Sequence, residues 1–252
     1  MTDIPQDHPR YLSLLTRERI VEGVKVGITS MQGLIAQGRG ECFDYLLGEK
    51  THQFATESER VAAAMLILAE HPIISVNGNT AALVPEQMIR LSEIVSASLE
   101  VNLFHRTDER VNRIIDHLMN NGASEVLGGK GDANLPLSHA RGIVDKNGIF
   151  SADVVLVPLE DGDRCETLVG MGKKVITIDL NPLSRTSRTA TVSIVDNVVR
   201  ALDVIADAAL GMQDWDREQL VKLVESYDNK VNLKMSLDAI NENLRNMANE
   251  VL

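Results

Sequence analysis

Residues 174–197, KVITIDLNPLSRTSRTATVSIVDN, contain two apolar runs separated by a loop that is rich in Ser, Thr and Arg. Each run, 174–180 and 190–196, is short, rich in Val and Ile, and nearly continuous in its apolar residues. Such runs are typical of parallel strands that are covered on both faces of a sheet. The loop between them has more hydroxyl and guanidinium donors than a turn needs. The stretch therefore predicts two adjacent buried strands joined by a loop that binds an anion.

The same pattern extends over the middle of the chain. Four further apolar runs lie at 73–77, 100–104, 124–128 and 152–158, and helical patterns lie between the runs at 81–97, 107–121, 163–171 and 198–211. Alternation of short strands with helices is typical of an α/β fold. We expect a Rossmann-like doubly wound, mostly parallel sheet with an N-terminal helical segment and C-terminal helices.

This pattern predicts three parts of the chain. Residues 1–70 form an N-terminal helical segment that covers the site, and Thr56 with Glu59 is expected to form a capping box there. Residues 71–212 are expected to form the Rossmann-like core, and residues 213–252 are expected to form C-terminal helices whose apolar stripe suits packing or a dimer contact.

Composition limits the kind of ligand. The chain has 252 residues, 44% of them hydrophobic, and a formal net charge of -11 from 25 basic and 36 acidic residues. An acidic chain with few aromatic residues is a poor candidate for a nucleic-acid binder, which uses a basic surface and stacking rings. The basic residues comprise 16 Arg and only 9 Lys, and Arg is the side chain that binds phosphate and carboxylate with two parallel hydrogen bonds.

Other motifs are missing from the sequence. Cys42 and Cys165 are far apart and form no CxxC pair, which favours a reducing cytoplasm. No apolar run approaches the roughly 20 residues that span a bilayer, so no membrane association is expected. The six His residues form no cluster with Cys, so we expect no structural metal site.

Four loops follow predicted strands, where ligands bind in open parallel sheets. They are NGNTAAL at 77–83, HRTDER at 105–110, GGKGDAN at 128–134 and LEDGDR at 159–164. A helix that begins near Thr80 suits an anion at its N-terminus. The acidic loop at 159–164 either caps the following helix or holds Mg²⁺. Each loop taken alone is also compatible with an ordinary turn, and Arg106 could simply pair with Asp108 or Glu109.

Several longer segments carry a resemblance to a known family. They are LLTRERIVEG at 14–23, GLIAQGRGECFDYLLGE at 33–49, ADVVLVPLEDGDR at 152–164 and MGKKVITIDLNPLSRTSRTATVSIVDNVVRA at 171–201. Together they resemble the archaeal 4-phosphopantoate--beta-alanine ligases, also called phosphopantothenate synthetases, over about residues 10–210. The resemblance implies a homodimeric enzyme of coenzyme A biosynthesis. It also implies that ATP and Mg²⁺ serve to join 4-phosphopantoate to β-alanine, with release of AMP and diphosphate through an acyl-adenylate.

The resemblance also implies which residues contact ATP. They are Arg17, Arg39, Asp179, Leu180, Asn181, Arg185, Thr186, Asn197 and Val198. Arg17 and Arg39 lie outside the strand pattern, so the N-terminal helices must fold over the site or reach the site of a partner subunit. The reaction brings several anions together, so positioning and charge neutralisation carry it and no nucleophilic side chain is expected.

The organic acid needs anchors of its own, away from the charges of ATP. We expect these in the loops after the first three strands, where the candidates are Asn77, Asn79, Arg106 and Lys130. These loops belong to the same sheet edge as the nucleotide loop but follow different strands.

Two other functions are compatible with the same fold. One is an NAD(P)-dependent oxidoreductase, although no predicted strand is followed by GxGxxG. The other is a non-enzymatic nucleotide-binding protein. Formation of AMP only when both organic substrates are present would distinguish a ligase from either of them.

Overall fold

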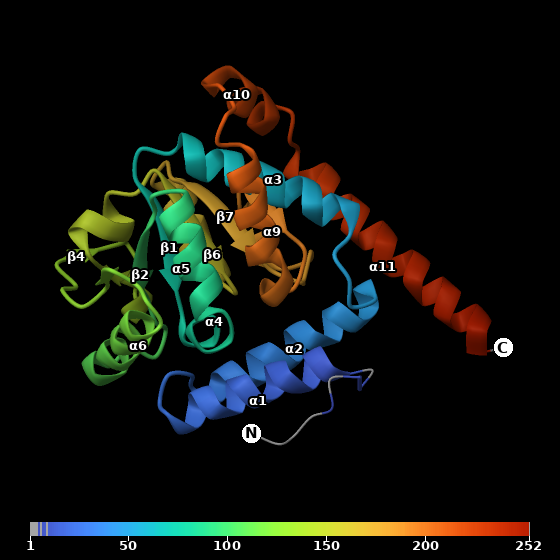
Figure 1. The fold of residues 1–252 in the computed structure, drawn as a ribbon, viewed down its shortest axis with the longest axis horizontal. Coiled ribbons are helices and arrows are strands. Elements are labelled where there is room, and N and C mark those ends of the chain that lie inside the picture. The colour runs from blue at the N-terminus through green and yellow to red at the C-terminus, as the bar shows by residue number, and fades with distance from the viewer. Residues whose placement is uncertain (1–4, 6, 9, 252) are drawn as a thin grey trace.

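The computed structural model describes residues 5, 7, 8 and 10–251 and has a central sheet of six parallel strands (Figure 1). In spatial order these are β3 (Val126–Leu127), β2 (Ser98–Val101), β1 (Pro72–Val76), β6 (Val154–Pro158), β7 (Lys174–Ile178) and β8 (Val192–Ile194). The order reverses between β1 and β6, which is the switch point at which open parallel sheets bind ligands. The α/β, Rossmann-like doubly wound prediction is confirmed.

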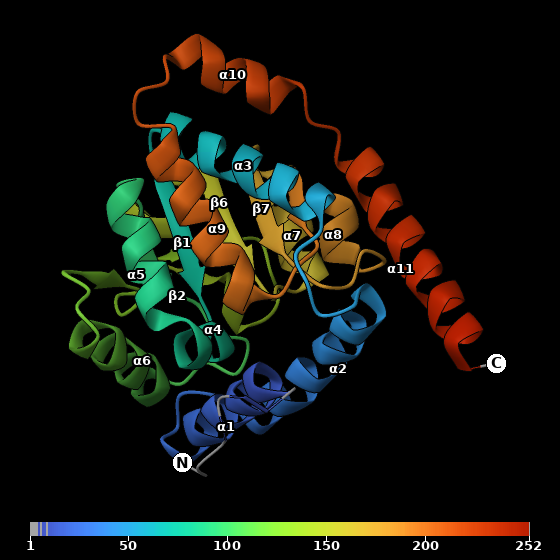
Figure 2. The same cartoon turned by 45° about the vertical axis from the view of Figure 1, so that its right-hand side comes forward.

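Helices cover both faces of the sheet because its strands are apolar on both sides. On β1, Ile74 and Val76 face one hydrophobic core, and Ile73 faces another on the opposite side. In Figure 2, α3 (Gln53–Leu68), α5 (Pro85–Ile94) and α9 (Val198–Gly211) lie in front of the sheet, and α7 (Gly162–Gly170) and α8 (Arg185–Thr189) lie behind it. The front layer is completed by α6 (Asp108–Asn120), whose buried residues join the first core.

The N-terminal helices α1 (Tyr11–Lys25) and α2 (Met31–Leu47) run side by side and contact the short helix α4 (Gly78–Leu83), which follows β1 (Figure 1). They therefore cover the carboxyl edge of the sheet. Gly33 allows this close approach, since a Cβ at this position would collide with Asn79 and Thr29. Within this chain, α1 and α2 thus lie against the segment that follows β1.

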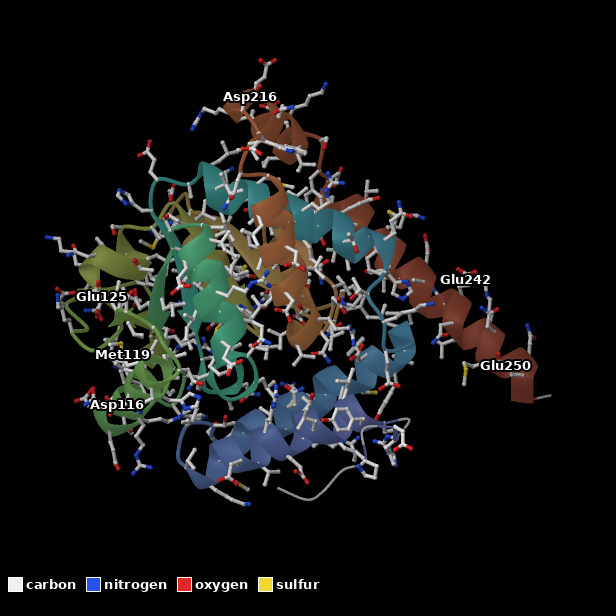
Figure 3. The ribbon with its side chains drawn as sticks, in the orientation of Figure 1. Asp116, Met119, Glu125, Asp216, Glu242 and Glu250 are labelled. Atoms are coloured by element: carbon white, nitrogen blue, oxygen red, sulfur yellow. The ribbon has the colours of Figure 1, made fainter. Side chains whose placement is uncertain are left out.

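The C-terminal helices lie on other sides of the core. α10 (Arg217–Glu225) packs on α3 at the opposite end from α1, and α11 (Asn229–Val251) packs on α2, α3 and α8. Figure 3 shows Glu242 and Glu250 on the part of α11 that extends beyond the rest of the chain.

Residues between β3 and β6 form a small unit that the apolar pattern does not predict. It contains the antiparallel pair β4 (Ala133–Asn134) and β5 (Ile143–Val144), a 3₁₀ turn at Ala140–Gly142 and a π turn at Lys146–Phe150. Its strands are two residues long, which is too short for a periodicity to be visible. The buried Glu100 on β2 holds this unit by accepting hydrogen bonds from the backbone N–H groups of Asp145 and Ile149.

Two local predictions were wrong. Thr56 and Glu59 form no capping box, because α3 begins at Gln53 and Glu59 is a fully buried residue in its middle. The helix expected at 81–97 is two helices, α4 and α5, because Pro85 cannot continue α4 and instead begins α5. In the described part of the chain, no helix is both long and apolar enough to span a membrane.

Candidate functional site

A cleft of about 260 Å³ opens at the switch point between β1 and β6. We call it the switch-point cleft. It lies beneath α2, which contributes Gln32, Gly33, Ala36 and Arg39 to its wall. Its remaining lining residues come from the segments after β1, β2, β4 and β6 and before α2: Ser30, Asn77, Asn79, Leu103, Phe104, His105, Arg110, Arg141, Leu159 and Asp161.

The cleft has an excess of positive charge. Among its lining residues Arg39, Arg110 and Arg141 are cations, and Asp161 is the carboxylate. Arg110 donates to the carbonyl oxygens of Ile28 and His105, at 2.9 and 3.1 Å, and pairs with no carboxylate among the described residues. Burial, with the nearby charge of Arg141, lowers the pKa of the Arg110 guanidinium. An anion bound in the cleft would neutralise this unpaired charge.

A buried ionic network holds Arg141 in the cleft wall. The carboxylate of Glu160, at the end of β6, lies 3.2 Å from Arg141 Nη1 and also pairs with Arg164 Nη1. Arg164 is completely buried and its Nη2 donates to Ser75 Oγ on β1 at 3.2 Å. Asp161 Oδ2 lies 2.7 Å from Arg141 Nε, an ion pair without hydrogen-bond alignment. The guanidinium of Arg141 is therefore fixed by two carboxylates of the loop after β6.

Asn77 and Asn79 line the cleft, but their side chains already have structural partners. Asn77 caps α4, because its Oδ1 accepts from the N–H groups of Asn79 and Thr80 while its Nδ2 donates to Pro158 O at 2.8 Å. Asn79 Nδ2 donates to Gly33 O at 2.9 Å and so ties α4 to α2. The N–H groups at the start of α4 are thus satisfied within the chain, and they need no anion as the sequence had suggested.

Arg106 and Lys130 lie apart from these two Asn residues. Arg106 Nη2 donates to Gly128 O at 2.8 Å, while its Nη1 is buried without a partner, and the side chain pairs with neither Asp108 nor Glu109. Lys130 lines a different cavity of about 270 Å³ beside β3. Neither residue lines the switch-point cleft, so the structure brings together only part of the predicted organic-acid site.

A second cleft, of about 350 Å³, lies on the other side of α2. We call it the helical cleft, because α1, α2 and the start of α9 form most of its wall. Arg17 and Asn197, both predicted nucleotide contacts, line it. Arg17 is held by Glu41 at 2.7 Å, and Asn197 Nδ2 donates to Asp44 Oδ2 at 2.7 Å. The two residues are 180 positions apart in sequence, and the packing of α1 and α2 brings them together.

Arg200 strengthens the floor of the helical cleft. Its guanidinium pairs with Asp44 of α2 at 2.7 Å and with Asp196, which follows β8. These pairs, with the hydrogen bonds from Asn197, join α2 to the carboxyl end of β8. Val198 is buried in the main core, so it could contact a ligand only through its backbone.

The loop after β7 lies under α2 and is organised by its own first residue. Asp179 accepts hydrogen bonds from Asn181 N at 2.9 Å and from Ser184 Oγ, and burial raises the pKa of its carboxyl. The charge of Arg39 acts on Asp179 from α2 and opposes this rise. Leu180 is buried beneath Gly40 and faces the core formed by α2, α3 and α11. This places Arg39 above the loop after β7, residues 179–184, which is the predicted nucleotide loop.

Arg185 and Thr186 turn towards α7. Thr186 is buried and its hydroxyl donates to Glu160 O at 2.9 Å, so that donor is already used within the chain. The Arg185 side chain is 59% exposed and lies 3.8 Å from Asp163 and 3.5 Å from Glu166, in loose ion pairs that a phosphate could replace. Neither residue lines the switch-point cleft or the helical cleft.

Glu59 is a buried carboxyl behind the helical cleft. Both its oxygens are enclosed and make no hydrogen bond. Burial, with the charge of Asp196, raises its pKa to about 8, so it is protonated in the folded protein at neutral pH.

Stability should therefore depend on pH through Glu59. The unfolded chain releases this proton near the ordinary Glu pKa, so the stabilisation is complete below that value and is lost as the pH rises towards about 8. We expect the melting temperature of Glu59→Gln, relative to that of the unmodified protein, to increase as the pH is raised from about 5 to about 8. A difference that stays constant over this range would contradict a protonated Glu59.

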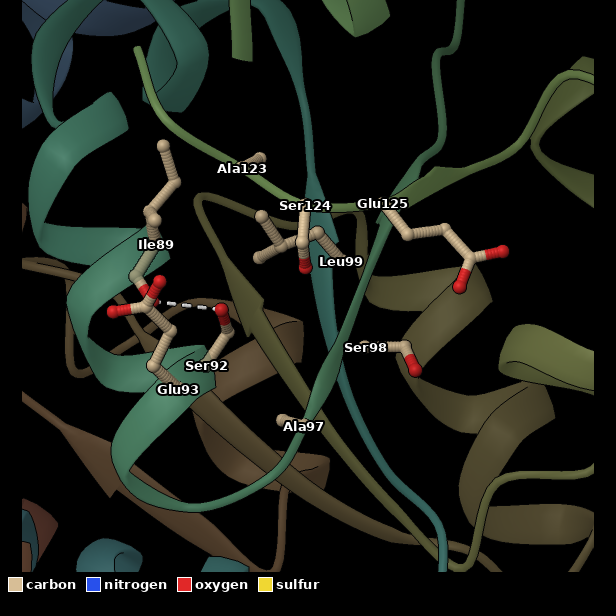
Figure 4. Close-up of a pocket in the computed structure, with 9 residues that line it drawn as sticks. All are labelled: Ile89, Ser92, Glu93, Ala97, Ser98, Leu99, Ala123, Ser124 and Glu125. Carbon is tan, nitrogen blue, oxygen red and sulfur yellow. Dashed lines mark hydrogen bonds between the residues drawn. The ribbon is translucent and has the colours of Figure 1, made fainter. Parts of the chain in front are cut away.

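A further cavity lies away from the carboxyl edge. This cavity, of about 120 Å³ (Figure 4), lies beside the amino ends of β2 and β3 and is lined by Ser98 and Glu125, with Glu93 and Ser92 on α5. Ser92 Oγ there donates to Ile89 O at 2.7 Å. Within the described residues, no group of three or more His, Cys, Asp or Glu side chains is arranged to hold a metal ion.

The sequence pattern missed the two most enclosed cations of the switch-point cleft. Arg110 stands in the quoted loop HRTDER, of which only Arg106 was predicted to contact the organic acid. Arg141 lies between β4 and β5, in a unit without any visible pattern. An excess of Arg over Lys was the available signal, but it does not say which Arg residues are buried.

The chain is similar to known proteins over nearly its whole length. A family model described as phosphopantothenate/pantothenate synthetase matches residues 54–243. A Methanosarcina mazei protein named 4-phosphopantoate--beta-alanine ligase is 62% identical over 250 residues, covering 99% of each chain. Proteins of the same name from Thermococcus kodakarensis and Methanospirillum hungatei are 53% and 49% identical, covering 99% and 97% of this chain and 97% and 99% of their own. The chain belongs to the phosphopantothenate/pantothenate synthetase family.

Proposed function

We propose that this protein is an ATP-dependent ligase that joins 4-phosphopantoate to β-alanine in coenzyme A biosynthesis and releases AMP and diphosphate. The names of its relatives support this assignment. The observation that carries it within the chain is the switch-point cleft, with the unpaired Arg110 and the fixed Arg141 beside the nucleotide loop. Such a cleft suits a small acid with a phosphate at one end.

The chemistry accounts for these residues. A carboxylate is a poor electrophile, so in the proposed reaction its oxygen attacks the α-phosphate of ATP and forms an acyl-adenylate, which the amine of β-alanine then opens. This step places a phosphate, a carboxylate and a triphosphate close together. Fixed cations and backbone N–H groups offset their repulsion and stabilise the charge that develops on phosphorus.

We propose that the acid and the nucleotide bind on different sides of α2. The 4-phosphopantoate phosphate is assigned to Arg110 and Arg141, with Asn77 and Asn79 shaping the wall. ATP is assigned to the part of the sheet edge that extends from the loop after β7 to the helical cleft. Its proposed contacts are the remaining predicted residues: Arg17, Arg39, Asp179, Leu180, Asn181, Arg185, Thr186, Asn197 and Val198. Arg106 and Lys130 remain predicted contacts of 4-phosphopantoate. To reach it, their side chains would have to move towards the switch-point cleft.

Mg²⁺ is part of the proposal because it neutralises a bound triphosphate. It commonly uses one or two protein carboxylates together with phosphate oxygens and water, so a cluster of three protein ligands is not required. On the ATP side of α2, the carboxylates of Asp44, Asp179 and Asp196 already accept hydrogen bonds within the chain, so phosphate oxygens and water would supply most of the Mg²⁺ ligands.

We also propose a homodimer in the cytoplasm, with α1 and α2 near the interface. Leu12, Met31 and Ile35 on these helices are 64–68% exposed, which is unusual for large apolar side chains unless another surface covers them. Cys42 and Cys165 are free thiols, consistent with a reducing compartment. Residues 1–70 would cover the site, and residues 71–212 would form the nucleotide-binding core. Residues 213–252 would form helices that pack on the outside of this core.

The test is AMP formation with purified protein, ATP, Mg²⁺, 4-phosphopantoate and β-alanine. AMP should appear at a high rate only when both organic substrates are present. Turnover of a nicotinamide cofactor, or nucleotide binding with no AMP formed, would contradict the ligase.

Arg39→Lys should lower the rate of AMP formation well below that of the unmodified protein. Lys keeps the charge above the nucleotide loop but loses the planar fork that binds two phosphate oxygens at once. Turnover at the unmodified rate would show that Arg39 acts only as a solvated charge.

A further inference from the structure

His139 and Asp163 form a hydrogen-bonded pair beside the switch-point cleft. His139 Nε2 lies 2.8 Å from Asp163 Oδ2. Although burial opposes it, the hydrogen bond from His139 lowers the pKa of Asp163 below its usual range, so this carboxyl is an anion at neutral pH. An anionic partner fixes the proton of the neutral ring on Nε2 and leaves the lone pair on Nδ1. That Nδ1 is enclosed and has no hydrogen-bond partner among the described residues.

The pair lies between the two predicted halves of the site. On one side, the His139 ring packs on Phe104, which lines the switch-point cleft, with a centroid distance of 5.0 Å. Asp161 of the cleft wall also acts on His139 electrostatically. On the other side, Asp163 faces Arg185, from the helix that follows the nucleotide loop, at 3.8 Å. A group here is near the place where an acid in the cleft would meet the α-phosphate of ATP.

On the basis of the ligase reaction proposed above, we propose that His139 is the general base for β-alanine, with Asp163 as the residue that positions its ring. His139 Nδ1 takes one proton from the ammonium group as the substrate enters from the Phe104 side. The neutral amine then attacks the acyl carbon, a C–N bond forms, and the bond from that carbon to the phosphate oxygen breaks. AMP leaves with the electron pair, and the second amine proton passes from the new amide nitrogen to solvent.

The neighbouring groups are less suited to this task. His105 also flanks Phe104, at a centroid distance of 5.1 Å, and lines the cleft, but no carboxylate orients it in the described structure. Cys165 is buried, and burial raises the pKa of its thiol to about 12. Asp161 is engaged by Arg141. His139 alone among these combines an oriented ring with an unused lone pair, which is the arrangement expected of a general base.

Separate assays of the two half-reactions test this role. Exchange of labelled diphosphate into ATP, dependent on 4-phosphopantoate, reports acyl-adenylate formation, and amide formation requires β-alanine as well. We expect His139→Gln to keep the exchange rate within about twofold and to lose about 10²- to 10⁴-fold in amide formation, the usual range for removal of a general base. Hydroxylamine, which is unprotonated at neutral pH, should trap the acyl group equally well in both proteins.

The pH dependence adds a readout that a structural role would not change. The rate of amide formation by His139→Gln should rise with pH as the β-alanine ammonium loses its proton to solvent. The rate of the unmodified protein should rise less steeply. The charged groups that face the ring, Asp161, Asp163 and, through Asp163, Arg185, are retained in this variant. Asp163→Asn should show a smaller loss of the same kind.

His105→Gln is the comparison variant, because it removes the other ring beside Phe104, and it should lose less amide formation than His139→Gln. The control is His71→Gln, which changes an exposed residue just before β1 that lines neither cleft, and it should change amide formation little. The proposal is overturned if His139→Gln leaves amide formation unchanged, if exchange and amide formation fall together, or if His105→Gln causes the larger loss. An unmodified protein that lacks exchange would instead contradict the proposed ligase reaction.

Discussion

Replacement of Arg164 by Ala is expected to lower the free energy of unfolding by about 3–5 kcal/mol, because it removes the more closely paired of the two cations that neutralise a buried carboxylate. The Glu160 carboxylate is almost completely buried and pairs with both Arg164 and Arg141. Arg164 itself is fully buried, and burial lowers the pKa of its guanidinium. For a chain of this size, such a loss corresponds to a fall in melting temperature of roughly 6–20 °C.

A double variant distinguishes loss of the ion pair from loss of packing volume. Arg164→Met with Glu160→Leu removes both charges and keeps apolar volume, so it should recover much of the stability lost in Arg164→Ala. It should not recover activity, because Glu160 also holds Arg141 in the cleft wall. Thermal unfolding of the three proteins measures this. Equal melting temperatures for Arg164→Ala and the unmodified protein would show that the network does not stabilise the fold.

Arg110→Ala is expected to raise the KM for 4-phosphopantoate by about 10- to 150-fold, which corresponds to loss of a charge-assisted contact of roughly 1.5–3 kcal/mol. Arg110 is a half-buried cation of the switch-point cleft and lacks a carboxylate partner in the described structure, so a bound anion would take that place. The affinity for ATP should stay within about twofold, since the nucleotide is assigned to the other side of α2. Steady-state kinetics and calorimetry with ATP give the two values.

Arg113→Ala is the matched control, because this Arg lies one turn further along α6 and pairs with Glu109 at 2.6 Å on the surface. It should leave both constants unchanged. Arg106→Ala should raise the same KM less than Arg110→Ala, because Arg106 already donates to Gly128 O outside the cleft. If Arg110→Ala weakens ATP binding and does not change this KM, the two halves of the site are reversed.

The sequence by itself determined the fold class and the edge of the sheet at which the switch-point cleft lies. Continuous runs such as ADVVLVP and KVITIDL are apolar on both faces, so they can be stable only inside a sheet that helices cover on both sides. Polar residues directly after such strands must then meet at one edge, as Asn77 and Asp161 do in the switch-point cleft. These conclusions depend on local periodicity, which a single sequence displays. The periodicity did not predict β4 and β5, because each has only two residues, and it did not predict the break between α4 and α5 at Pro85.

Only the tertiary structure decided which polar side chains are used within the chain and which face a cleft. Thr186 and Asn77 have residue types suited to ligands, yet their side chains bond to Glu160 and Pro158 because the neighbouring strand ends leave buried carbonyl groups to satisfy. Arg110 and Arg141 come from segments without a strand pattern, and they become cleft residues because α2 and the unit around β4 and β5 fold over the sheet edge. Burial, charge pairing and the shift in the pKa of Glu59 depend on contacts between residues far apart in sequence. No local pattern encodes those distances, so they appear only when the chain is folded.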